Sequence, residues 1–473
     1  MGPSTTCDFR FRAFTLALTA GVLAFLPASL LPTEAAARLS FAPPQRLSDS
    51  NPAEERIAPV TAVDGRGVAT IAWVQGAPDW DDARVVAARI DPGGSAGKPS
   101  AVSAPGDGGA PVLAVDDRDR VTVAWTTFSD DGIYRLRARR IGPEGALGSA
   151  RTLLTLRPRN GFEVLSSDNL DATVDARNRV TVAVAVSRST RSKPQRSTWR
   201  VHAVRLSAGG DGDERTLFDE RRSATGSVRI SDLQLADSAA DGTRVLWRTE
   251  RYETRGRDSV RGVTIAADGS VDGARTLFRD TARSTIADAQ LSGSHVAIVR
   301  ESAGGSALTM RAARIRSGGS LGPVRDVASS RGDLNPRIAS LPRRRSALVW
   351  EGGRRIKSTQ LDARGKPGRT RKISRRSGAA RGPEIAVDPA GRATVVWRQA
   401  DDREEALDAV RLAKDGAPGA VASVVVDPGA RLLRAPQIAV DRSGRPTVAW
   451  TRIYTGEDGT YVSVIEASRG AGS

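Results

Sequence analysis

The chain has 473 residues, with 47 glycines, 25 prolines and a formal net charge of +17. Its only cysteine is Cys7, which excludes disulfides and thiolate metal sites from the rest of the chain. Short apolar runs rich in Val, Ile and Trp alternate with Gly, Pro and Asp, and no long helical period is present. The composition therefore predicts a folded all-β protein.

The N-terminal segment has the pattern of a targeting sequence. Arg10 and Arg12 precede an apolar stretch over residues 13–31, and the small residues Ala35 and Ala37 follow. A basic start, an apolar middle and a small-residue site are the three parts of a secretory signal peptide. We expect residues 1–37 to be this signal peptide and the mature protein to be secreted, extracellular or at the cell surface. An uncleaved membrane anchor is the alternative.

One pattern recurs along the rest of the chain, most clearly over residues 58–73, 110–125, 382–397 and 435–450. It ends at anchor positions about 50 residues apart: Trp73, Trp125, Val184, Trp247, Val299, Trp350, Trp397 and Trp450. Five anchors follow an aspartate by nine residues, namely Asp64, Asp116, Asp175, Asp388 and Asp441. A fixed period of this length indicates a propeller, a solenoid or an array.

Each unit contains four predicted strands. The first ends at the aspartate turn, the second ends near the anchor, and two more follow, as at residues 85–90 and 151–154. The last unit has only three strands, whereas residues 38–48 look like an isolated fourth. We therefore predict a single eight-bladed β-propeller over residues 38–473, in which the N-terminal strand completes the last blade. A β-solenoid is the alternative.

The pattern P-x-[IV]-A-V-D-x-x-G-R-x-T-V-x-W resembles the repeats of secreted bacterial propellers, and its first half is similar to the NHL repeat. It more loosely resembles the Asp-box of sialidase-like propellers, although that element lies between strands three and four rather than one and two. The resemblance covers residues 38–473. It implies the fold but no particular function, because propellers host many unrelated activities.

The sequence contains few candidate catalytic groups. The chain has two histidines, His202 and His295, each in or beside a predicted strand, and no HExxH, paired CxxC or Walker-type loop. The two G-x-S-x-G matches, at 93–97 and 318–322, fall in the same predicted turn and lack the strand–helix context of a hydrolase. We expect the turn aspartates to cap their turns rather than bind calcium. No catalytic residue, metal or cofactor is expected.

A sialidase-like carbohydrate-active enzyme is the alternative function. That resemblance would imply three arginines, a Tyr–Glu nucleophile pair and an acidic acid/base. Tyr252, with Glu250 and Glu253 beside it, is the one such pairing, whereas the Arg-Ile-Pro motif of the family is absent.

Two features indicate binding. The loops between second and third strands vary most, and they hold or border every tyrosine. The ligand-binding candidates are Trp80, Tyr134, Trp199, Tyr252, Tyr454 and Tyr461. The second feature is charge, because residues 337–381 hold 15 Arg or Lys and two acids. The candidates for binding a polyanion are Arg343, Arg344, Arg345, Arg354, Arg355, Arg369, Arg371 and Lys372.

The sequence thus predicts a secreted, non-enzymatic binding or scaffold propeller. Its expected partners are anionic cell-envelope polymers, glycans or a protein, with no specific role in nucleic-acid recognition. The ligand is expected on the face that carries the loops between second and third strands.

Overall fold

In the computed structural model, residues Ala36–Ser473 form one compact unit. The structure describes residues 39–129, 131–158, 162–165, 169–190, 197–207, 212–222, 228–238, 242–251, 258–280, 284–302, 305, 307–375, 377–401, 404–428, 433–456 and 459–471. The predicted signal peptide, residues 1–37, lies outside this range. No helix in the described part of the chain is long and apolar enough to span a bilayer.

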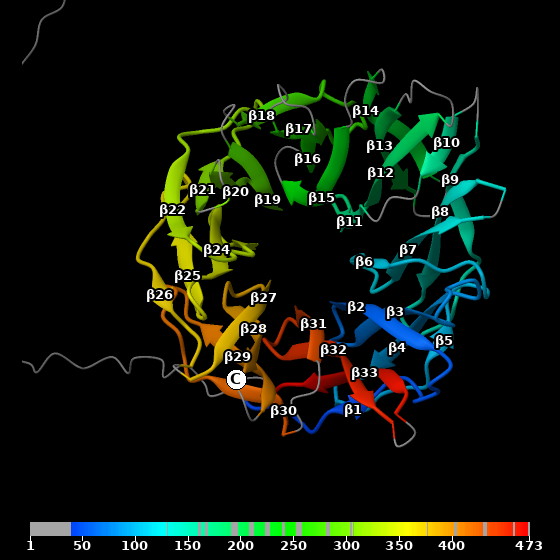
Figure 1. Cartoon of the computed structure of the whole chain (residues 1–473), viewed down its shortest axis with the longest axis vertical. Coiled ribbons are helices and arrows are strands. Elements are labelled where there is room, and N and C mark those ends of the chain that lie inside the picture. Colours follow the sequence, from blue (N-terminus) through cyan, green and yellow to red (C-terminus); the bar gives the residue numbers. More distant parts are fainter. Residues whose placement is uncertain are drawn as a thin grey trace, which may run out of the picture. The chain divides into compact units, whose positions relative to one another are not determined.

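The unit is an eight-bladed β-propeller, as predicted (Figure 1). Each blade is an antiparallel sheet whose four strands follow one another from the central channel to the rim. The innermost strands are β2 (Glu55–Val63), β6 (Val112–Val115), β11 (Leu170–Val174), β15 (Val228–Ser238), β19 (Ser284–Ser292), β23 (Arg337–Leu341), β27 (Ala379–Val387) and β31 (Leu433–Val440). The second strands are β3 (Ala69–Gly76), β7 (Val121–Phe128), β12 (Val180–Thr190), β16 (Gly242–Arg251), β20 (His295–Ser302), β24 (Arg345–Glu351), β28 (Ala393–Ala400) and β32 (Pro446–Thr455).

The outer half of each blade completes the sheet. The third strands are β4 (Arg84–Ile90), β8 (Tyr134–Ile141), β13 (Ser197–Leu206), β17 (Ser259–Ile265), β21 (Leu308–Arg314), β25 (Ile356–Leu361), β29 (Glu405–Leu412) and β33 (Tyr461–Arg469). The fourth strands are β5 (Ser100–Ala101), β9 (Arg151–Leu156), β14 (Gly212–Arg222), β18 (Arg275–Arg279), β22 (Arg325–Ser330), β26 (Arg371–Lys372), β30 (Ala422–Asp427) and β1 (Gln45–Arg46). An additional strand, β10 (Phe162–Leu165), pairs with the far end of β12.

The N-terminal strap, residues 39–48, closes the ring by completing blade 8. In β1, Gln45 pairs with Ala467 and Arg46 with Glu466 of β33. Beyond these pairs, Leu47 N–H donates to the Ile465 carbonyl at 2.8 Å. Leu39 and Leu47 are both 4% exposed, and they pack on opposite sides of blade 8, against blades 7 and 1 respectively. The predicted closure is confirmed.

The core lies between the blades, where eight hydrophobic clusters occupy the eight interfaces. Every anchor tryptophan is at most 1% exposed and faces the preceding blade. Val184 takes this place in blade 3. In blade 5 the equivalent residue is Ile298, whereas Val299 faces blade 6. A two-residue turn, 293–294, joins β19 to β20 and shifts the pattern by one residue.

The turn aspartates cap their turns, as expected. Asp441 Oδ1 accepts the backbone N–H groups of Ser443 and Arg445, both at 2.9 Å. Its other oxygen accepts Arg445 Nε at 2.9 Å. Equivalent i, i+4 ion pairs join Asp116 to Arg120, Asp175 to Arg179 and Asp388 to Arg392.

Because the strands of a blade alternate in direction, the propeller has two unlike faces. The turns between strands one and two and between strands three and four form one, which we call the turn face. The loops between strands two and three and the connections between blades form the other, the loop face.

Candidate functional site

A cavity of about 510 Å³ opens at the centre of the turn face. We call it the mouth. It is lined by residues 63–65, 115–117, 387–389 and 440–442 together with Ser340 and Pro342. These residues come from the first turns of blades 1, 2, 6, 7 and 8, so turns far apart in the sequence surround a single cavity.

Four of the five carboxylates that line the mouth, those of Asp64, Asp116, Asp388 and Asp441, are engaged in the turns, whereas Asp117 is exposed. Burial alone would raise the pKa of Asp441, but hydrogen bonds from Ser443 and Arg445 outweigh it and lower the pKa. Asp441 also binds Arg469, which is 4% exposed, at 2.8 Å. Asp64 Oδ2 accepts a hydrogen bond from Arg89 Nη2 at 3.3 Å. These four buried aspartates therefore hold turns and neighbouring strands together, and Asp117 is the one lining carboxylate that is exposed.

Exposed arginines surround the mouth. Arg118 lies in the first turn of blade 2, Arg343 and Arg344 in that of blade 6, and Arg442 in that of blade 8. Within the described part of the chain, none of these four side chains forms an ion pair. Arg66 and Arg177 occupy the same turn in blades 1 and 3, but they bind Glu144 at 2.5 Å and the Ala267 carbonyl at 3.2 Å. The mouth thus combines four engaged carboxylates and one exposed carboxylate, Asp117, with four unpaired guanidinium groups.

The basic segment 337–381 does not form one surface. Arg343, Arg344 and Arg345 lie at the turn-face end of β24, whereas Arg354 and Arg355 follow its other end and lie on the loop face. Arg369, Arg371 and Lys372 lie along the outer edge of blade 6, at and before β26. The strand between the two arginine groups has seven residues, which separates them by about 20 Å.

Acids of the neighbouring blade pair with part of this basic segment. Arg337 binds Glu384 at 2.8 Å and Arg375 binds Asp408 at 2.9 Å. Arg371 binds Asp415 at 3.4 Å. All three acids belong to blade 7, where residues 382–428 hold nine acidic and five basic residues. The sequence-based expectation of a single blade-wide basic patch is therefore wrong in its geometry.

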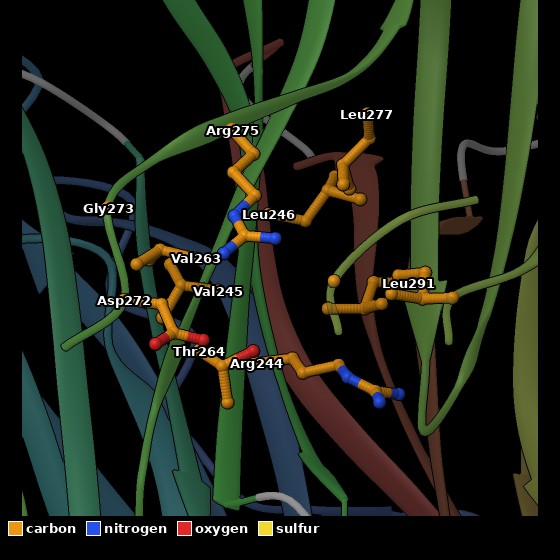
Figure 2. Close-up of a pocket in the computed structure, with 13 residues that line it drawn as sticks. Arg244, Val245, Leu246, Val263, Thr264, Asp272, Gly273, Arg275, Leu277 and Leu291 are labelled. Atoms are coloured by element: carbon orange, nitrogen blue, oxygen red, sulfur yellow. The ribbon is translucent and has the colours of Figure 1, made fainter. Parts of the chain in front are cut away.

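Many other arginines join neighbouring blades. A cavity of about 20 Å³ between blades 4 and 5 is lined by Arg244, Arg275, Leu246 and Leu291 (Figure 2). Each of its arginines donates to a carbonyl of blade 5, at 3.1 and 2.7 Å. The same kind of contact, from an arginine to a carbonyl of the next blade, is made by Arg140, Arg179, Arg205, Arg345, Arg411, Arg445 and Arg469. These arginines therefore hold neighbouring blades together.

Charged side chains also gather on the inner strands of blades 4 to 7. Asp232 binds Arg248 at 2.7 Å, and Arg337 binds Glu384 of the next blade. Burial raises the pKa of Asp232 to about 6, and it also raises the pKa values of Asp288 and Glu384. The group thus contains carboxylates with shifted pKa values and two arginines.

Among the residues that the structure describes, no tyrosine belongs to this group. Tyr134, Tyr454 and Tyr461 lie in blades 2 and 8, and Tyr252 lies outside the described residues. Glu250, beside Tyr252 in the sequence, accepts Ser231 Oγ at 2.7 Å and binds Arg248 at 2.7 Å.

The predicted aromatic ligand contacts fall into three classes. Tyr461 is 79% exposed, and Trp80 and Tyr454 are partly exposed, all on the loop face. Trp199 is partly buried against the cluster between blades 3 and 4. Tyr134 is 1% exposed and packs in the core between blades 2 and 3, so it cannot contact a surface ligand.

No family model matches the chain, and no curated protein matches its sequence. Among solved structures, a protein of unknown function from Dyadobacter fermentans DSM 18053 is 9% identical, with a TM-score of 0.43 over 92% of this chain and 99% of that one. The WD40 domain of SCAP from fission yeast is 10% identical, with a TM-score of 0.48 over 92% and 98%. Puromycin hydrolase is 16% identical, with a TM-score of 0.47 over 89% of this chain and 62% of that one. These likenesses concern the fold and carry no functional conclusion.

Proposed function

We propose that the protein is a secreted, non-enzymatic binding or scaffold propeller that docks an anionic polymer on its turn face. The observation that carries this proposal is the mouth. Four exposed arginines from blades 2, 6 and 8 surround a single cavity of about 510 Å³, and no described ion pair neutralises them. A concentration of one charge around a concave surface attracts polyions of the opposite charge.

The carboxylates of the mouth favour the same conclusion. Because Asp116, Asp388 and Asp441 each pair with the arginine four residues on, their charge is already balanced within the turn. The charges left unpaired at the mouth are those of Arg118, Arg343, Arg344 and Arg442 and of the exposed Asp117, so positive charge exceeds negative charge there by three. Of the residues proposed from the sequence for polyanion binding, Arg343 and Arg344 belong to this surface.

The test compares two variants that lose the same charge. In the mouth variant, Arg118, Arg343, Arg344 and Arg442 become Gln. In the control, Arg354, Arg369, Arg371 and Lys372 become Gln. Binding of polyphosphate, dextran sulfate and poly-L-glutamate is measured by titration calorimetry at 150 mM salt. We expect the mouth variant to bind at least one of these polymers tenfold or more weakly than wild type, and the control to change less than threefold.

Equal losses in both variants would show that net charge alone is responsible. A larger loss in the control would place the site on the loop-face end and rim of blade 6. Either result, or absence of binding by wild type, would overturn the proposed docking site. The choice among the three polymers identifies whether phosphate, sulfate or carboxylate groups are preferred.

Secretion is the second part of the proposal, and it rests on the basic, apolar and small-residue pattern of residues 1–37. Mass spectrometry of the protein recovered from the culture medium is expected to give an N-terminus near residue 38. Retention of the full-length chain in the membrane fraction would contradict cleavage.

A carbohydrate-active enzyme is the second candidate, favoured by the carboxylates Asp232, Asp288 and Glu384 on the inner strands, whose pKa values are raised. If this group is catalytic, wild type hydrolyses a chromogenic sialoside and Glu384→Gln does not. Failure of wild type to hydrolyse the sialoside would reject the sialidase-like activity.

A further inference from the structure

The loop face of blades 8, 1 and 2 carries several exposed apolar side chains. Five large hydrophobic side chains are exposed in the described part of the chain, and three lie here: Ile57 at 40%, Phe128 at 49% and Tyr461 at 79%. The partly exposed Trp80 and Tyr454 lie on the same loops and strand ends. We call these five residues the apolar patch. It spans the junction where the ring closes.

The patch rests on fixed backbone. Arg56 N–H donates to Ser463 Oγ at 2.8 Å, which ties the start of β2, next to Ile57, to the start of β33, next to Tyr461. Trp80 has a φ of +63°, in the left-handed region that residues other than glycine rarely adopt. Its loop is held by hydrogen bonds from Trp80 N to Ala77 O at 2.8 Å and from Ala83 N to Trp80 O at 3.1 Å.

The connection between blades 1 and 2, which contains Gly108, packs against this loop. A Cβ on Gly108 would lie 2.5 Å from the backbone of Ala83, so only glycine permits this approach. Ala77 N–H also donates to Asp82 Oδ1 at 2.6 Å. The Trp80 ring is therefore presented by a braced loop, which reduces the entropy that binding would cost.

The charge around the patch is opposite to that of the molecule. The described residues of the loops 49–54, 77–83, 103–111, 129–133 and 456–460 include seven acids and no Lys or Arg, in a chain with 71 Lys and Arg. Among the described acids, Asp79, Asp81 and Asp131 are exposed and form no ion pair. Glu54 and Asp107, by contrast, bind Arg84 and Arg137.

We propose that the apolar patch docks a Lys- or Arg-rich polypeptide segment. Aromatic faces attract cationic heads within about 6 Å, and the aliphatic stems of Lys and Arg cover apolar surface. Exposed carboxylates beside the rings add complementary charge and raise the association rate. This surface is on the face opposite to the mouth, so the proposal does not depend on the docking of an anionic polymer. With both sites, the propeller would connect a basic partner to an anionic polymer.

The test uses fluorescein-labelled octalysine and fluorescence anisotropy at 100 mM salt. One variant carries Phe128→Ala and Tyr461→Ala, and its control carries Val324→Ala and Val426→Ala, the other two exposed hydrophobic residues. A second variant carries Asp79→Asn and Asp81→Asn, and its control carries Asp117→Asn and Asp272→Asn on the turn face. We expect each patch variant to bind octalysine at least fivefold more weakly than wild type, and each control to stay within twofold.

The Arg→Gln mouth variant is expected to bind octalysine at least as tightly as wild type, because it removes repulsive charge. Unchanged melting temperatures show that all variants are folded. The proposal is overturned if wild type does not bind octalysine, if acid variants on both faces weaken binding equally, or if the aromatic variant binds like wild type. The proposal would also be overturned if a neutral oligosaccharide competed with octalysine, required Tyr461 for binding and bound independently of salt. The apolar patch would then bind a glycan.

Discussion

Replacing the two leucines of the N-terminal strap tests how strongly the strap holds the ring. Leu39 and Leu47 are each 4% exposed, and burial of this kind makes Leu→Ala cost about 2–5 kcal/mol. The two side chains lie in different clusters, on opposite sides of blade 8, so their effects should add. With about 3 kcal/mol for each, the double variant should lose about 6 kcal/mol of unfolding free energy.

The loss of unfolding free energy cannot exceed a limit, because a destabilised strap can detach while the rest of the ring stays folded. The loss in global stability then stops at the free energy of docking the strap. The assay combines urea unfolding followed by tryptophan fluorescence with hydrogen exchange at Leu47, whose N–H donates to Ile465. A strap that detaches loses protection at Leu47 before the midpoint of unfolding.

Val426→Ala serves as the control, since Val426 is 45% exposed in β30. A change below about 0.5 kcal/mol for Leu47→Ala, the size usual for surface substitutions, with unchanged exchange at Leu47, would refute the reasoning. The strap would then contribute no buried contact that matters to folding.

Three further predictions concern the blades themselves. Trp397→Ala and Trp450→Ala should each reduce the unfolding free energy by about 3–5 kcal/mol in urea titrations, because both rings are fully buried, and near-neutral results would contradict their core role. Asp441→Ala removes the carboxylate partner of the buried Arg469, so it should cost about 3–5 kcal/mol in thermal or urea unfolding, whereas a cost below 1 kcal/mol would show that the pair is unimportant. Burial lowers the pKa of His295 to about 4, below its unfolded value of about 6.5, so stability should fall by up to about 3 kcal/mol as the pH drops from 6.5 to 4. His295→Gln should remove that part of the pH dependence, and an unchanged profile would reject it.

The sequence was sufficient for the fold because each blade repeats the same local signals. The aspartate turn, the buried tryptophan and the incomplete last unit together specify four-stranded blades and their closure. The predicted anchor of blade 5, Val299, is wrong by one residue. Because the turn at 293–294 has only two residues, Ile298 rather than Val299 lies at the interface with blade 4.

The site was only partly predictable. Tyr134 and Tyr461 each begin a third strand and look alike in sequence, but Tyr134 packs against blade 3 and Tyr461 faces solvent. The charge of residues 337–381 predicted one basic surface that contains both Arg343 and Arg354. The strand β24 lies between these two residues and places them on opposite faces. The mouth gathers Arg118 and Arg442, which are separated by more than 300 residues. The signal available in advance was the recurrence of arginines two or three residues after the end of the first strand, as at Arg66, Arg118 and Arg442.

Both proposed surfaces depend on a closed ring, because the mouth joins the first turns of blades 8 and 1 and the apolar patch spans the same junction. The most direct test is a cross-link between Gln45→Cys and Ala467→Cys, which pair directly across β1 and β33, with Cys7→Ser removing the only native thiol. Mild oxidation of the monomer should form this disulfide intramolecularly, which non-reducing peptide mapping detects, whereas Gln45→Cys with Ser100→Cys on the outer strand of blade 1 should not react as readily. Absence of the cross-link, or its formation only between two molecules, would contradict closure of the ring by its own N-terminal strap.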